Sequence, residues 1–161
     1  MNSSNNNIGG KLYEMIEDKG LPWGVGSTAL IAGLGARLIN LSFSVSKIEN
    51  SISKERIKTL FLLCDKDDRL FQEFINDDDG NNSALFINEV PIQLLEQIIF
   101  ILNETVGYDD NIKENVKVDY FMGLSYLKEA ASQLLHIIYN NLANIEKNME
   151  EMRKINGELK K

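Results

Sequence analysis

A segment rich in glycine and alanine, residues 20–36, is the sequence feature that most constrains the fold of this chain. It begins as a loop and continues into a helical pattern that carries Gly33 and Gly35 in its interior. Glycine inside a helix costs about 1 kcal/mol relative to alanine, because glycine loses more backbone freedom on folding. We therefore expect either another helix or a ligand to lie against this backbone at close range.

The start of this helix predicts a binding loop. Gly24 and Gly26 permit backbone dihedrals that a Cβ would forbid, and Ser27 stands where an N-cap residue is expected. A helix N-terminus offers unpaired N–H groups and the positive end of the dipole, which suit a phosphate, a carboxylate or a polarised carbonyl. The alternative is a loop in which glycine only allows a sharp turn.

The same loop fits the dinucleotide pattern Gly24-x-Gly26-x-x-Ala29. A strand should precede that motif, but residues 11–20 indicate a helix followed by a turn. A Walker lysine is also missing after the loop. We therefore reject both nucleotide-binding motifs.

Length and charge limit the class of protein. The 161 residues suffice for one domain with a substantial core, which we place at residues 8–161 after a disordered tail at residues 1–7. A net charge of −7 argues against a nucleic-acid partner. The single Cys64 excludes an intrachain disulfide and fits a reducing compartment.

The N-terminal residues lack the basic and apolar regions of a signal peptide. Residues 29–45 are the only stretch that resembles a membrane span, and we judge it too short and too polar because it contains Arg37 and Asn40. The sequence therefore predicts a soluble, cytoplasmic protein that makes no membrane contact.

Hydrophobic periodicity predicts an all-α, up-and-down bundle of about five helices, at residues 11–18, 27–50, 53–76, 91–106 and 115–158. The second of these helices carries two stripes. One is apolar and comprises Leu30, Leu34, Leu38, Leu41, Val45 and Ile48. The other is small and comprises Ala29, Gly33, Ala36 and Asn40. From the small stripe we predict that the protein dimerises through helix packing.

Few residues suit catalysis. His136, the only histidine, has apolar neighbours that favour a packed core position, and no cysteine or histidine lies at metal-ligand spacing, so we expect no metal site. Asp119 has apolar neighbours too, which would raise a carboxyl pKa and suit general acid–base chemistry. Asn115 is four residues earlier, on the same face of the expected helix. Alternatively, Asp119 is a solvated residue in a first helical turn.

Five short motifs occur in a characteristic order. The Gly-rich loop at residues 21–27 ends in a serine, and four further matches follow it: Asp67 to Phe71, Glu89-Val90-Pro91, Asn115 with Asp119, and Asn141-Leu142. In this order they resemble the cyclodeaminase/cyclohydrolase family of folate enzymes, over about residues 12–141.

The resemblance implies an all-α homodimer that binds a reduced folate and requires no further cofactor. The implied reaction is either ring closure with loss of ammonia or opening of the methenyl bridge by water. Asp119 would transfer a proton and Asn115 would orient it. The implied substrate-binding residues are Gly24, Gly26, Ser27, Asp67 and Asn141.

Departures from the family pattern suggest an alternative. The loop contains Trp23 and Val25 where the family has proline and glycine, and basic residues that could bind an anionic folate tail are scarce. The alternative is a helical dimer that has lost catalysis and acts as a scaffold or a small-ligand binding protein.

Overall fold

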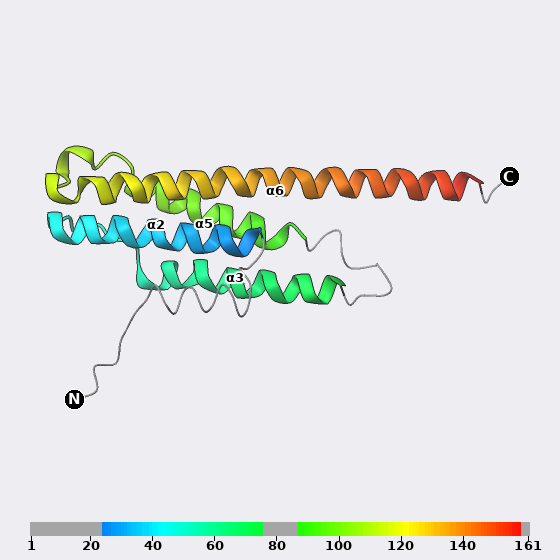
Figure 1. The fold of residues 1–161 in the computed structure, drawn as a ribbon, viewed down its shortest axis with the longest axis horizontal. Helices are drawn as coiled ribbons and strands as arrows, with labels where there is room; N and C mark the ends of the chain where they lie inside the picture. Colours follow the sequence, from blue (N-terminus) through cyan, green and yellow to red (C-terminus); the bar gives the residue numbers. More distant parts are fainter. Residues whose placement is uncertain (1–23, 76–86, 159–161) are drawn as a thin grey trace, which may run out of the picture.

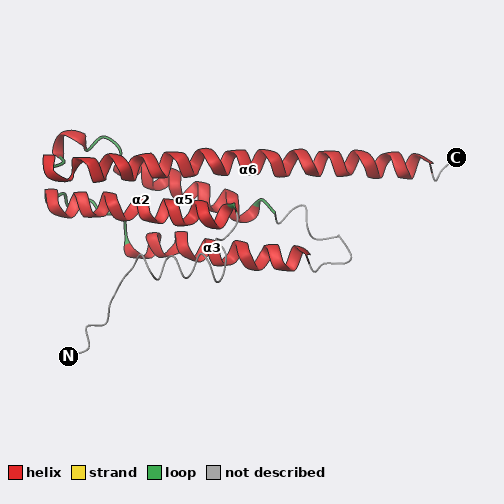
Figure 2. Cartoon of the chain, in the orientation of Figure 1, coloured by secondary structure: helices red, strands yellow, loops and turns green. Residues whose placement is uncertain are grey.

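The described part of the chain is all-α. The computed structural model describes residues 24–75 and 87–158, and within these ranges it contains helices and no strand (Figures 1 and 2). The α-helices are α2 (Val25–Ser46), α3 (Lys54–Ile75), α5 (Glu89–Thr105) and α6 (Lys117–Glu158). Two short 3₁₀ helices, η1 (Asp109–Asn111) and η2 (Glu114–Val116), precede α6.

The expected fold class is therefore confirmed, but the described residues form four α-helices and not about five. The helix expected at residues 11–18, the tail at residues 1–7 and Trp23 lie outside the described residues.

Successive α-helices run in opposite directions, so the bundle is up-and-down (Figure 1). The helix α2 packs against α6 and α3, and α5 packs against α6 and α3 in turn. The C-terminal part of α6 extends past the ends of the other helices (Figure 1). The whole of α2 consequently lies beside the N-terminal half of α6, with Ser42 near Val116 at one end and Gly24 near Ile137 at the other.

Local hydrogen bonds fix the turn between α2 and α3. Lys47 takes a left-handed conformation with φ of 60°, and its N–H bonds to carbonyls at the end of α2, which closes that helix earlier than the predicted residue 50. Ser53 accepts the N–H of Arg56 at 3.1 Å and so caps α3. The Asn40 side chain exchanges two hydrogen bonds with the backbone of Ile52, at 2.7 and 2.8 Å.

The small residues of α2 form the inner face of the bundle. Ala29 and Ala36 are 0% exposed, and Gly33 lies under the ring of Phe61 from α3, where an added Cβ would be 2.5 Å from the ring. These residues pack helices within one chain. Ala29, Gly33 and Ala36 are thus buried within one chain, so a dimer would have to form through another surface, and dimerisation itself stays a prediction.

Two helices approach each other closely at Gly35 of α2 and Gly123 of α6. A Cβ on Gly35 would lie 2.8 Å from the Gly123 carbonyl oxygen, and a Cβ on Gly123 would lie 2.7 Å from the Gly35 carbonyl oxygen. Backbone atoms on both sides leave no room for a side chain. The expectation that the glycines serve a close approach is thus confirmed, with a helix as the neighbour.

Candidate functional site

The predicted binding loop forms the N-terminus of α2, but Ser27 does not cap it. The helix begins at Val25, and the N-cap is Gly24, with φ of 54° and no side-chain cap. The Ser27 hydroxyl donates to the Gly24 carbonyl at 3.0 Å, as does the Thr28 hydroxyl at 2.8 Å. The N-cap prediction is wrong because the turn at Gly24 starts the helix before Ser27.

The loop residues differ in exposure. Gly24 is exposed, Ser27 is half-buried and Gly26 is buried. A Cβ at Gly24 would lie 3.9 Å from Ile137, so this end of α2 adjoins the middle of α6. Among the loop residues that the structure describes, Gly24 and Ser27 are therefore the ones accessible to a ligand from solvent.

The predicted catalytic pair does not share a helix face. Asn115 lies in η2 and is exposed, whereas Asp119 is in the first turn of α6 and half-buried. Of the apolar neighbours of Asp119, Val118 and Phe121 are exposed, so the carboxylate is not in an apolar interior. Its position fits the alternative reading, in which a carboxylate stabilises a helix N-terminus.

The loop and the catalytic pair lie at opposite ends of the α2–α6 contact. Thr28 approaches Gln133 at one end, and the Ser42 hydroxyl donates to the Val116 carbonyl at the other. The rise of 1.5 Å per residue puts Thr28 and Ser42 about 21 Å apart. Ser27 and Asp119 of one chain are therefore too far apart to contact one small substrate.

Asn141 belongs to a polar network at the end of the bundle that holds Gly24. Its side-chain amide donates to Asn88 Oδ1 at 2.9 Å, and Asn88 is the buried N-cap residue of α5. The next residue, Glu89, pairs with Lys66 of α3 at 2.5 Å. The hydrogen bond and the charge of Lys66 lower the pKa of the Glu89 carboxyl. These contacts join α3, α5 and α6.

Asp67 is half-buried on α3, next to Lys66 of this network. Asn141, Asp67, Gly24 and Ser27 thus lie towards one end of the bundle, and Asn115 and Asp119 lie at the other. Asn141 and Asp119 occupy one unbroken helix, so they cannot contact one small substrate within one chain. Sequence analysis missed Asn88, although an asparagine before Glu-Val-Pro is a helix-start signal.

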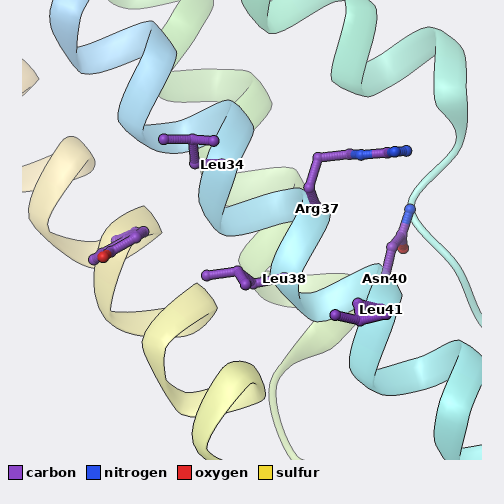
Figure 3. A pocket seen from close by; sticks show the side chains of 6 residues that line it. Leu34, Arg37, Leu38, Asn40 and Leu41 are labelled. Atoms are coloured by element: carbon purple, nitrogen blue, oxygen red, sulfur yellow. The ribbon is translucent and has the colours of Figure 1, made fainter. Parts of the chain in front are cut away.

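A shallow groove on the outer side of α2 was not predicted. It encloses about 520 Å³ and is lined by Leu34, Arg37, Leu38, Asn40, Leu41 and Tyr126. Leu34, Leu38 and Leu41 point to one side of α2, and Arg37 and Asn40 point to the other (Figure 3). The leucine stripe that the sequence revealed is therefore on the outside, where Leu34 and Leu41 are each 50% exposed.

His136 is exposed on α6, so its predicted core position is wrong. Among the described residues, no group of three or more His, Cys, Asp or Glu side chains could hold a metal ion.

One described helix, Val25–Ser46, is long and apolar enough to cross a membrane, although half of its most apolar window is buried in the bundle. This helix of 22 residues is longer than the stretch at residues 29–45 that the sequence indicated.

Comparisons with protein-family models, with curated proteins and with solved structures gave no match for this chain.

Proposed function

We propose that this protein is a homodimeric helical scaffold that works by association and not by catalysis. The observation that carries the proposal is the outer side of α2. A surface helix of a soluble protein normally turns polar residues to solvent, whereas α2 exposes leucines there. An exposed apolar surface of this kind is typical of an interaction site.

The arrangement of the candidate catalytic residues also favours this proposal. General acid–base catalysis requires the proton carrier to lie within hydrogen-bonding reach of the bound substrate. Asp119 is at the far end of the α2–α6 contact from the Gly24 loop, beside the exposed Asn115. The groove on α2 is lined mainly by apolar residues and contains neither of them.

The second candidate is the folate cyclohydrolase or cyclodeaminase that the motif order implies. One observation favours it: Gly24, Ser27, Asp67 and Asn141 all lie towards one end of the bundle. In this candidate a reduced folate would bind at that end.

An absorbance assay separates the two candidates. The full chain is incubated with methenyltetrahydrofolate, whose absorbance hydrolysis would remove, or with formiminotetrahydrofolate, from which ring closure would produce that absorbance. Each absorbance change is compared with buffer alone. The scaffold proposal predicts the same rate with and without protein, and no folate binding by calorimetry. Protein-dependent turnover would contradict the proposal. If Asp119→Asn abolished that turnover, the enzyme candidate and its proton carrier would both be supported.

A further inference from the structure

The outer face of α2 is a regular apolar seam. We define this face as Ile31, Leu34, Leu38, Leu41 and Val45, which are all exposed or half-buried. Their spacing alternates between three and four residues, which averages 3.5. This heptad spacing is the one that lets two helices interdigitate along a common seam. The pattern therefore points to a helix as the occupant of the face.

Aromatic side chains extend the seam on both sides. Phe61 of α3 covers Gly33 on one flank and is itself exposed. Tyr126 of α6 lines the groove on the other flank, beside Leu34 and Leu38. The apolar surface is thus broader than one helix, and aromatic residues of this kind are enriched at protein interfaces.

The distribution of charged residues indicates which kind of helix can pack against the outer face of α2. The chain has 24 acidic residues and a net charge of −7, so two copies repel each other over most of their surface. The helix α2 contains no aspartate or glutamate, and Arg37 is its only charged residue. On the outer face of α2, two acidic chains can therefore meet without bringing acidic residues of α2 together.

We infer that the outer face of α2 packs against the same face of a second copy of this chain. This inference rests on the proposed function and assigns its interface. A two-fold axis makes one patch self-complementary, so the seam needs no other surface of the partner. The dimer buries Leu34 and Leu41, and the C-terminal part of α6 stays outside this contact.

A lipid surface is a poorer occupant than a second chain. Helices that lie in a membrane interface carry several basic residues, which anionic headgroups attract. Arg37 is the only basic residue on α2, and the acidic chain as a whole is repelled by an anionic leaflet. The inner face of α2 is also occupied by the bundle core.

The inference is tested by sedimentation equilibrium of the full chain and of Leu34→Glu, Leu41→Glu and Ile99→Glu. All three substitutions replace exposed residues, and Ile99 lies on α5, away from the seam. The α2 variants place a charged side chain within the apolar contact, so their dissociation constants should rise by about 100-fold or more. The dissociation constant of Ile99→Glu should not change. Circular dichroism checks that each variant is folded.

If an α2 variant fails to fold, cross-linking still tests whether the outer face of α2 forms the dimer interface. Leu38→Cys in a Cys64→Ala background should give a covalent dimer with a short bismaleimide, and Ile99→Cys should not. The interface would be wrong if Ile99→Glu weakened the dimer and the α2 variants did not, or if Ile99→Cys cross-linked and Leu38→Cys did not. The scaffold proposal would stand in both cases, because the chain would still form a dimer. A monomeric wild-type chain would overturn both. Binding of that monomer to phosphatidylcholine vesicles would assign the face to lipid.

Discussion

Tyr120 is the largest fully buried side chain in the described part of the protein, and it joins α6 to the end of α5. Its hydroxyl donates to the Thr105 carbonyl at 2.8 Å and accepts the Tyr108 N–H at 3.3 Å. Its ring stacks on Phe43 of α2, with the centroids 6.1 Å apart. Burial raises the pKa of the Tyr120 hydroxyl. One side chain thus connects three helices.

Replacing Tyr120 by phenylalanine should lower the free energy of unfolding by about 1–3 kcal/mol, because the substitution leaves buried backbone groups without a partner. The raised pKa means that the native state favours the protonated hydroxyl. This stability is complete below the ordinary value of 10.0 and is lost as the pH rises through the folded value. Urea unfolding at neutral pH and near pH 11 should show a smaller alkaline loss for Tyr120→Phe. The exposed control Tyr139→Phe should match wild type at both values.

Lys66→Met should return the pKa of Glu89 towards its ordinary value of 4.5, because Lys66 is the main cause of the lowered value. Wild-type Glu89 contributes stability above that ordinary value, and the contribution is lost as the pH falls through the folded pKa. Carbon-detected NMR titration of the carboxyl measures the change directly. A titration midpoint that stayed the same in Lys66→Met would show that the pair does not form in solution.

Helix α2 illustrates what periodicity can and cannot predict. The sequence correctly predicted a helix with an apolar stripe and a small stripe, because spacing along one helix is a local property. It could not predict which stripe faces inward, because that depends on how closely α6 approaches. Gly35 and Gly123 allow backbone contact, so the small stripe forms the core and the leucines stay outside.

We predict that alanine substitutions at two nearby glycines of α2, Gly35 and Gly33, have unequal effects on the melting temperature. Gly35→Ala should lower the melting temperature, because the new methyl group meets the Gly123 carbonyl at 2.8 Å and the cost of about 1–3 kcal/mol exceeds the helix-propensity gain of about 1 kcal/mol. In Gly33→Ala the nearest atoms to the new methyl group belong to the ring of Phe61, an exposed side chain that can rotate away. Its effect should be much smaller. Equal melting temperatures for the two variants would contradict the packing described here.

At the scale of the whole molecule, the antiparallel order of the helices separates residues that the sequence placed in one site. The distance between Asp119 and Asn141 was predictable, since both lie on one helix. The separation of Ser27 from Asp119 was not, because it depends on the pairing of Thr28 with Gln133 and of Ser42 with Val116. The fold class was readable from local spacing, whereas the site required these long-range contacts.

The most direct test of the scaffold proposal is the mass of the unmodified chain in solution. Sedimentation equilibrium over a range of micromolar concentrations should give twice the chain mass of 18.2 kDa, because the association of two copies covers the apolar outer side of α2. A mass of 18.2 kDa at every concentration would contradict the account.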